Sequence, residues 1–270
     1  MKEFLKLDKV CCGYGSGFML QELSLSLPKG MFAGIIGPNG SGKTTLFKGI
    51  SGEIGIKKGG ITLNEQNVRQ MPLKERARSI AIVNQFPEAV DISVQDYVLM
   101  GRLPYRESFQ FFETKQDLEI AEKYMKLTQV DGFKHKSMLQ LSGGEQQLAA
   151  IAQALTQEPD LLLLDEPTSH LDITHQVQVL NLIQKLNESL QLTVLMIIHD
   201  LSLAAEYCDY LIMMNNGHIF KQGSPIEVLT YQNIEDVYHT VVITQMNPIS
   251  KRPAVFLVSD RMLNRGTNTE

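Results

Sequence analysis

GPNGSGKT (Gly37–Thr44) decides the fold of this 270-residue chain. The stretch fits the pattern glycine, four residues, Gly-Lys-Ser/Thr, which occurs once in the sequence. An apolar run, FAGII (32–36), comes before it, and TTLFKGI (44–50) carries the chain into a predicted helix. In such a strand, loop and helix, glycines let successive backbone N–H groups converge on phosphate oxygens. We therefore predict a nucleotide-phosphate loop in an α/β fold.

The residues of this loop have separate expected roles. Lys43 is expected to reach the β- and γ-phosphates of a bound nucleotide, and the hydroxyl of Thr44 is expected to ligate Mg²⁺. The nucleotide-binding residues that the stretch predicts are Gly37, Pro38, Asn39, Gly40, Ser41, Gly42, Lys43, Thr44 and Thr45.

A second glycine-rich stretch, LSGGEQQ (141–147), follows much later in the chain. Ser142 and Glu145 have the spacing of a capping box, and an apolar helical pattern comes after them. A serine and two glycines at a helix N-terminus also form a good anion site. The residues alone leave two interpretations open, a helix cap and a second phosphate site.

The stretch LLLLDEP (161–167) is a short apolar run that ends in two acids. Asp165, at the carboxyl end of a buried strand, is expected to hold Mg²⁺, mostly through the water shell of the ion. Glu166 is the better candidate for polarising an attacking water. A pair of solvated carboxylates at a strand end is the plainer alternative, and the phosphate loop argues against it.

Apolar runs and helical patterns alternate along the rest of the chain. SIAIV (79–83), TVLMII (193–198) and YLIMM (210–214) suit strands buried on both faces of a mainly parallel sheet. Apolar residues between such runs recur at helical spacing. From about residue 86 to residue 158 no convincing strand pattern occurs, and we interpret this stretch as a helical subdomain inserted into the sheet domain.

The composition narrows the class of protein. The net charge is −5 and no run is rich in lysine or arginine, which argues against a nucleic-acid binder. No apolar stretch has the length of a membrane-spanning helix. Cys11, Cys12 and Cys208 lack metal-ligand spacing, so we expect a reduced protein of the cytosol.

Taken in order, these motifs resemble the nucleotide-binding subunit of an ABC transporter. GPNGSGKT resembles the Walker A motif of that family, LSGGEQQ its signature and LLLLDEP its Walker B motif. Gln85 in VNQFPE resembles the Q-loop glutamine, SHLD (169–172) the D-loop and His199 in MIIHDL the switch histidine. Tyr14 in GYGSG stands where the family places an aromatic residue that stacks on adenine.

The resemblance implies a P-loop NTPase (RecA-like) fold. Its core is a mainly parallel sheet, with an N-terminal antiparallel β subdomain and an inserted α-helical subdomain. We expect residues 1–230 to form the nucleotide-binding domain, with the helical subdomain at about 86–158. Residues 231–270 are expected to form a small C-terminal extension.

The resemblance also implies a head-to-tail dimer that holds ATP and Mg²⁺ between two copies of the chain. Ser142, Gly143 and Gly144 of one copy would face the γ-phosphate of the ATP on the other copy. The second glycine-rich stretch would then serve the partner, because its helix dipole and N–H groups stabilise that charge only when the dimer closes. Asp172, counted here among the nucleotide-binding residues, is expected to shape the dimer seam.

Three residues are implied to carry ATP hydrolysis. Glu166 would act as general base, His199 would contact the γ-phosphate and the attacking water, and Gln85 would report the γ-phosphate and Mg²⁺ to the helical subdomain. The implied Mg²⁺ ligands are Thr44, Gln85 and Asp165. Plainer alternatives exist: His199 as a satisfied core histidine, Gln85 as a strand-end amide, and Tyr14 as a strand aromatic.

Several further stretches resemble one branch of the family, the ATPases that serve iron-siderophore, haem and cobalamin uptake. They are GRLPY, LLLDEPTSHLDITHQ, IIHDLSLAAEYCD and GSPIEVLT. The resemblance implies an importer ATPase at the cytoplasmic face of the cell membrane. Its partners would be a second copy of itself, separate integral-membrane permease subunits and, indirectly, a substrate-binding protein. A zinc or manganese importer ATPase and a non-transport ABC ATPase are the alternatives.

The stretch after Gln85 is expected to form the groove that receives a short helix of a membrane subunit. Arg102, Pro104 and Tyr105 are the contact candidates. The expected core residues of the same stretch are Val94, Val98 and Leu99. The chain departs from the family at Gln146, Leu148 and Gln153, where basic residues are common. We expect the lost positive charge either to weaken dimer closure or to leave its sensitivity to salt low.

Overall fold

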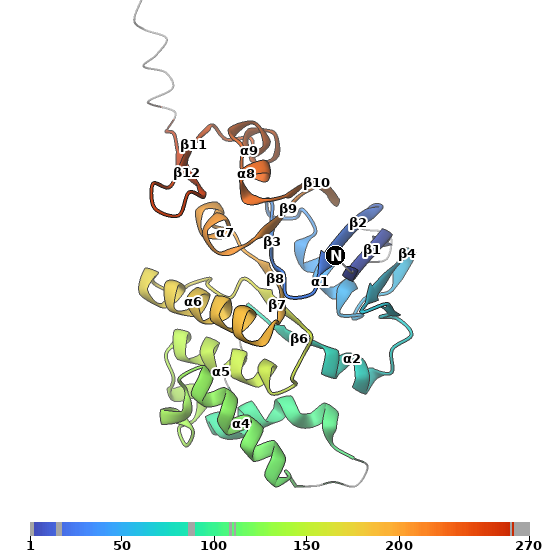
Figure 1. The fold of residues 1–270 in the computed structure, drawn as a ribbon, viewed down its shortest axis with the longest axis vertical. Helices are drawn as coiled ribbons and strands as arrows, with labels where there is room; N and C mark the ends of the chain where they lie inside the picture. The colour runs from blue at the N-terminus through green and yellow to red at the C-terminus, as the bar shows by residue number, and fades with distance from the viewer. Residues whose placement is uncertain are drawn as a thin grey trace, which may run out of the picture.

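The structure is a computed structural model that describes residues 3–14, 18–85, 90–107, 110, 112–259 and 261. Over these residues the strands form a six-stranded, a four-stranded and a two-stranded sheet. Helices pack around the six-stranded sheet, and a group of helices extends from it at the lower end of Figure 1. This arrangement confirms the predicted α/β fold.

The six-stranded sheet forms the centre of the molecule, in the strand order β10-β9-β3-β8-β7-β6. All neighbouring strands are parallel except β10, which pairs antiparallel with β9 at one edge. The strands are β3 (Phe32–Ile36), β6 (Ile80–Val83), β7 (Leu161–Asp165), β8 (Thr193–Ile197), β9 (Tyr210–Asn215) and β10 (His218–Gly223).

Successive side chains of a strand point to opposite faces of the sheet, so one apolar run contributes to the hydrophobic core on each face. On β7, Leu162 and Leu164 pack with the helices of one face, whereas Leu161 and Leu163 pack with α1 and the N-terminal sheet. All four leucines are fully buried. This double burial explains why the central strands are continuously apolar.

An antiparallel sheet in the order β2-β1-β4-β5 lies against the second face. Its strands are β1 (Glu3–Cys12), β2 (Leu23–Pro28), β4 (Ile56–Leu63) and β5 (Gln66–Asn67). The alternating leucines and serines of β2 give alternating buried and exposed positions, as the pattern predicts. The predicted N-terminal antiparallel subdomain is confirmed.

Two further groups of elements complete the sheet core and the C-terminal part. On the core sheet lie α1 (Lys43–Ile50), α2 (Leu73–Ser79), α6 (Ile173–Leu190) and α7 (Leu201–Tyr207). Toward the C-terminus lie α8 (Pro225–Val228), α9 (Tyr231–Tyr238) and a hairpin of β11 (Val242–Met246) and β12 (Pro253–Leu257).

Between β6 and β7 the described residues form only helices and 3-10 turns, apart from one isolated bridge. These are α3 (Val94–Leu99), η1 (Met100–Tyr105), α4 (Lys115–Leu127), η2 (Asp131–Phe133), η3 (Met138–Gln140) and α5 (Gly143–Leu155). Val94, Val98 and Leu99 are buried there, as predicted. Residues 86–89 of the predicted subdomain and groove lie outside the described residues.

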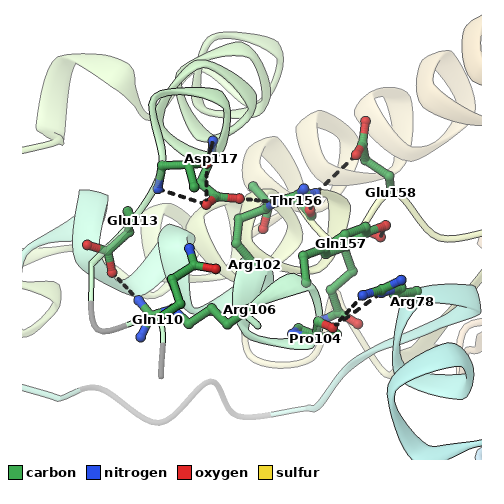
Figure 2. Close-up of polar contacts among 12 residues, drawn as sticks. Arg78, Arg102, Pro104, Arg106, Gln110, Glu113, Asp117, Thr156, Gln157 and Glu158 are labelled. Atoms are coloured by element: carbon green, nitrogen blue, oxygen red, sulfur yellow. Dashed lines mark hydrogen bonds and ion pairs between the residues drawn. The ribbon is translucent and has the colours of Figure 1, made fainter. Parts of the chain in front are cut away.

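Arg102 holds the end of this helical region together, so the prediction that it contacts a membrane subunit is wrong. Only 4% of the residue is exposed. Its guanidinium donates to Asp117 Oδ1 at 2.9 Å, to the Thr156 carbonyl at 2.7 Å and to Glu158 Oε2 at 3.0 Å (Figure 2). The Tyr105 ring covers the guanidinium at 3.7 Å. η1 is thus joined to α4 and to the end of α5.

Arg102→Ala is expected to lower the free energy of unfolding by about 3 kcal/mol, because it leaves the buried carboxylate of Asp117 without its cation. Burial disfavours ionisation of Asp117, but hydrogen bonds from Thr114 and Arg102 outweigh it and lower its pKa. Arg106→Ala is the control, since Arg106 pairs with Glu113 at a partly exposed site and should cost under about 1 kcal/mol. Urea denaturation measures the free energy of unfolding of both variants. If Arg102→Ala and Arg106→Ala lost the same amount, Arg102 would have no special role in stability.

A second set of contacts ties η1 to the core. Arg78 on α2 donates to the Pro104 carbonyl at 3.0 Å and lies 4.5 Å from the Tyr105 ring (Figure 2). Lys74, also on α2, donates to the Arg106 carbonyl at 2.6 Å. Because α2 runs directly into β6, these contacts link the helical region to the strand that ends just before Gln85.

Candidate functional site

The glycine-rich loop 37–42 connects β3 to α1, as predicted from the sequence. Gly37 has a φ of +148°, and a Cβ there would lie 2.3 Å from the Met214 carbonyl oxygen. Gly42 has a φ of +103°, and a Cβ there would lie 2.5 Å from Leu20 Cδ2. Both positions therefore require glycine, because a side chain would be strained and would collide with its neighbours.

Lys43 begins α1 and is buried beneath this loop. Its Nζ donates to the carbonyl oxygens of Gly37 at 2.8 Å and Pro38 at 3.0 Å. Burial lowers the pKa of Lys43, while the carboxylates of Glu166 and Asp165 act in the opposite direction. The arrangement concentrates positive charge and backbone N–H groups at one loop, which suits a polyphosphate.

A cavity of about 470 Å³ opens beside the loop. Its lining residues are Phe18, Asn39, Gly40, Gly42, Lys43, Thr44, Thr45 and Glu166. In the loop itself, the Ser41 hydroxyl is buried and has no hydrogen-bond partner among the described residues. A buried hydroxyl without a partner costs about 1–3 kcal/mol, so a ligand oxygen there would remove a penalty. This observation fits a phosphate-bearing ligand.

Glu166 lies at the centre of a group of side chains from three loops. Gln85 Nε2 donates to Glu166 Oε2 at 2.7 Å, and the Ser169 hydroxyl donates to the same oxygen at 2.9 Å. His199 Nε2 meets the other oxygen, Oε1. The three loops follow β6, β7 and β8, which are adjacent parallel strands, so their carboxyl ends meet at one sheet edge.

Two of the three residues predicted to be catalytic, Gln85 and His199, are therefore joined through the third, Glu166. Glu166 has a φ of +50°, and its N–H donates to the Ile197 carbonyl at 3.2 Å. A left-handed backbone costs a non-glycine residue about 1–3 kcal/mol, so the contacts around Glu166 must hold it in this conformation. Ser169 was predicted only as part of the D-loop, and its position three residues after Glu166 in a turn is the signal for its contact with this carboxylate.

Asp165 ends β7 beside this group and is half-buried. Burial, and then the neighbouring Glu166 carboxylate, raises the pKa of Asp165. A nearby cation such as Mg²⁺ would favour its charged form again. No group of three or more His, Cys, Asp or Glu side chains suited to a metal occurs in the described part of the chain. Mg²⁺ does not need one, because it keeps several waters and binds one or two protein oxygens plus phosphate.

Two aromatic residues lie near the loop. Tyr14 is 51% exposed. Lys48 Nζ, on α1, lies 5.8 Å from the centre of the Tyr14 ring, and a hydrogen bond between the two side chains raises the pKa of Lys48. Phe18 lines the cavity, and its ring lies 2.9 Å from where a Cβ of Gly42 would be. Tyr14 was predicted from the sequence and Phe18 was not, because its only sequence signal is an apolar residue in the segment between β1 and β2.

The second glycine-rich stretch forms a helix cap, as one of its two interpretations predicts. The Ser142 hydroxyl and N–H each donate to Glu145 Oε2 at 2.7 Å, which lowers the pKa of Glu145. A Cβ at Gly144 would lie 2.7 Å from the His175 ring, whereas one at Gly143 would meet nothing within 4 Å. Over the described residues, the lining of the loop cavity includes nothing from 141–147.

Asp172 caps α6 next to this stretch. It accepts from the His175 N–H at 2.9 Å and contacts the ring Nδ1 of the same histidine. Since His175 also packs against Gly144, the start of α5 and the start of α6 lie side by side. Gly144 of the predicted signature is thus placed close to the predicted D-loop residue Asp172, and neither of them lines the cavity beside the phosphate loop.

The three departures from the family pattern have local structural contacts. Gln146 Nε2 donates to the Met138 and Leu141 carbonyls, and Leu148 is buried. Gln153 lines a cavity of about 210 Å³ with Tyr97, Met100 and the end of β6. Gln153 lies about 15 Å along α5 from the helix start, and the expected weakening of dimer closure stays a prediction.

Comparisons with known proteins place this site in a family. The family model described as ABC transporter matches residues 20–169. The iron(3+)-hydroxamate import ATP-binding protein FhuC of Bacillus subtilis (strain 168) is 34% identical over 261 residues, covering 96% of each chain. In the part of the chain that the structure describes, no helix has the length and apolarity to cross a membrane.

Two solved structures are similar as well. A chain from an inward-facing structure of an ABC transporter described as metal-chelate type has a TM-score of 0.82 and 28% identity, covering 95% of this chain and 97% of that one. The dimeric ATP-binding cassette MJ0796, in a post-hydrolysis state with ADP and Pi, has a TM-score of 0.71 and 25% identity, covering 82% and 98%.

Proposed function

The chain belongs to the ABC transporter family, and we propose that it is the ATP-hydrolysing subunit of an importer for iron chelates of the ferric-siderophore kind. The observation that carries this proposal is the contact of Glu166 with Gln85 and His199 beside the phosphate loop. The iron-chelate cargo is supported by FhuC, which matches over nearly the whole of both chains.

ATP would bind with its phosphates on the loop 37–42 and its base toward Tyr14 and Phe18. Lys43 would exchange its carbonyl partners for phosphate oxygens, and the Ser41 hydroxyl would gain an acceptor. Thr44, Asp165 and the amide oxygen of Gln85 have the hard oxygen donors that Mg²⁺ prefers. When bound, the ion would neutralise charge that builds up on the phosphates.

Glu166 is the proposed general base for water attack. Its two oxygens are oriented by Gln85 and Ser169 on one side and by His199 on the other. A base held by several partners keeps its position and loses little entropy on the way to the transition state. His199 is proposed to hydrogen-bond the attacked phosphate, and Gln85 is proposed to report the state of the site to the helical region.

The proposed working unit is a head-to-tail dimer, in which the signature of one copy faces the ATP of the other. Ser142, Gly143 and Gly144 line no part of their own cavity in the described structure, yet they present a helix N-terminus with open space at Gly143. This geometry suits a phosphate brought by a partner. The dimeric cassette MJ0796 supports a two-copy assembly.

Membrane subunits are proposed to dock beside the end of β6, with the chain at the cytoplasmic face of the membrane. The cavity there is lined by Tyr97, Met100 and Gln153 among others, and Leu103 on η1 is 47% exposed nearby. A short partner helix with an apolar face fits such a surface. A substrate-binding protein would act on the membrane subunits and not on this chain.

Phe18→Ala is expected to weaken ATP binding about three- to tenfold, because an aromatic stack contributes roughly 0.5–1.5 kcal/mol. Tyr14→Ala should have an effect of the same size if both rings hold the base. Calorimetric titration with ATP measures both. Phe220→Ala is the control, since Phe220 is equally exposed on β10 and does not line the cavity. If ATP affinity fell in Tyr14→Ala but not in Phe18→Ala, Phe18 would not contribute to the ATP site.

The cargo is tested by purifying the chain with its membrane subunits and reconstituting them in liposomes. We expect ATP-dependent uptake of a ferric siderophore. Uptake of haem or cobalamin in place of a ferric siderophore would support an importer but would contradict the proposed ferric-siderophore cargo. Transport of zinc or manganese alone would overturn the iron-chelate proposal, and co-purification with no membrane protein would overturn the importer.

A further inference from the structure

A second cavity, of about 320 Å³, lies between the C-terminal end of α1, strand β4 and helix α2. It shares no lining residue with the cavity beside the phosphate loop. Five glycines contribute to its lining, so much of its wall is backbone. Its size is at the lower end of the range of small-molecule sites, which is about 300–1,000 Å³.

The charged side chains that line this cavity are all positive. Arg69 and Arg76 both line it, and no Asp or Glu does. Among the described residues, neither arginine has a carboxylate within ion-pair distance. Two guanidinium groups without a carboxylate make a site for an anion, because each can donate two parallel hydrogen bonds to a phosphate or carboxylate.

The backbone is shaped to admit one of these cations. Gly52 has a φ of +76°, and a Cβ there would lie 2.7 Å from Arg76 Nη1. The Arg76 guanidinium can therefore lie against the chain only because residue 52 is a glycine. Arg69 is held from the other side, since its Nη1 donates to the Ile56 carbonyl at 3.3 Å.

The rest of the lining has both apolar and polar parts. Ile61 and Val68 are each 2% exposed and give an apolar wall, and Ile54 adds to it. Asn67 and Gln70 contribute amide groups that can donate to or accept from a ligand. An apolar wall with a few converging polar groups is the usual composition of a site for an organic ligand.

We propose that this cavity binds a small organic anion, with a phosphate or carboxylate group held by Arg69 and Arg76 and an apolar body against Ile61 and Val68. The site is separate from the ATP site and lies at the opposite end of α1, the helix that begins with Lys43. It therefore does not depend on the transport function proposed above. The plainer alternative is that both arginines are solvated surface side chains.

Phenyl phosphate is a suitable probe, because it combines a phosphate with an apolar ring. The full chain is first saturated with ADP and Mg²⁺ to fill the ATP site, and phenyl phosphate is then titrated in a calorimeter. We expect saturable binding with one site per chain, tighter than inorganic phosphate and absent for phenol. Arg76→Ala should weaken it at least about tenfold, the usual effect of removing a hydrogen bond to a charged group.

Two further variants make the test specific. Gly60→Leu should abolish binding without removing charge, since a Cβ at Gly60 lines the cavity and meets only Asn67 Nδ2, at 4.0 Å. Arg78→Ala is the matched control: Arg78 lies on the same helix, faces Pro104 and should leave binding unchanged. No saturable binding in the unaltered chain, or binding unaffected by both Arg76→Ala and Gly60→Leu, would overturn the proposal.

Discussion

Glu166→Gln is expected to lower ATP turnover about 10²- to 10⁴-fold, the usual contribution of a general base, and to leave ATP binding nearly unchanged. Glutamine has the same shape and can still accept from Gln85 or Ser169, but it cannot take a proton from water. The phosphate contacts at Lys43 and the loop remain in place. The variant should therefore accumulate as an ATP-bound dimer.

Phosphate release and size-exclusion chromatography with ATP and Mg²⁺ measure both effects. Glu119→Gln provides the control, because Glu119 is exposed on α4 and pairs with Lys115 at 3.7 Å. That variant should turn over ATP like the unaltered chain. If Glu166→Gln also hydrolysed ATP at an unaltered rate, Glu166 would not be the general base.

Lys43→Ala is expected to act on the other half of the site and to weaken ATP binding about ten- to a hundredfold. Lys43 is the buried cation of the phosphate loop, and its loss removes charge-assisted hydrogen bonds that the loop N–H groups cannot replace. Hydrolysis should fall at low ATP concentration for the same reason.

Calorimetric titration of ATP in the presence of Mg²⁺ checks this result. Lys29→Ala serves as the matched variant, since Lys29 is exposed, pairs with Asp160 at 2.9 Å and lies outside the cavity. Its ATP affinity should not change. Unchanged affinity in Lys43→Ala would show that the loop does not bind phosphate in the proposed way.

The phosphate loop and the strands beside it could be predicted because their chemistry is local. The glycine positions of GPNGSGKT require particular backbone angles, and a strand buried on both faces must be apolar throughout. Gln85, Glu166 and His199 are far apart in sequence, but each follows a predicted strand. Parallel strands bring such residues to one edge, so the family resemblance and the strand pattern agreed on the same group.

The errors and omissions arose where tertiary partners decide the outcome. Arg102 in GRLPY reads as an exposed loop cation, yet Asp117 and the carbonyl of Thr156 bury it. Phe18 and Ser169 belong to the candidate site only because the chain folds them against Gly42 and Glu166. No periodic pattern marks such contacts, since each depends on how the fold orients one particular pair of residues.

The central claim is that each ATP is shared between the phosphate loop of one copy and the signature of the other. This claim can be tested with two variants, one altered in the phosphate loop and the other altered in the signature. Lys43→Ala removes the loop cation, and Gly143→Asp places a negative charge where the partner's γ-phosphate is proposed to lie. An acid is favourable in the first turn of α5, and a Cβ at Gly143 meets nothing within 4 Å, so the second variant should fold normally.

The decisive measurement is ATP hydrolysis by an equal mixture of these two variants, at an ATP concentration low enough that Lys43→Ala alone hydrolyses little ATP. In a head-to-tail mixed dimer, one site combines both altered halves and the other combines both unaltered halves. We expect the mixture to regain roughly a quarter of the unaltered activity, since half of the randomly formed dimers carry one intact site of two. A mixture that stayed as inactive as its components would contradict the shared site.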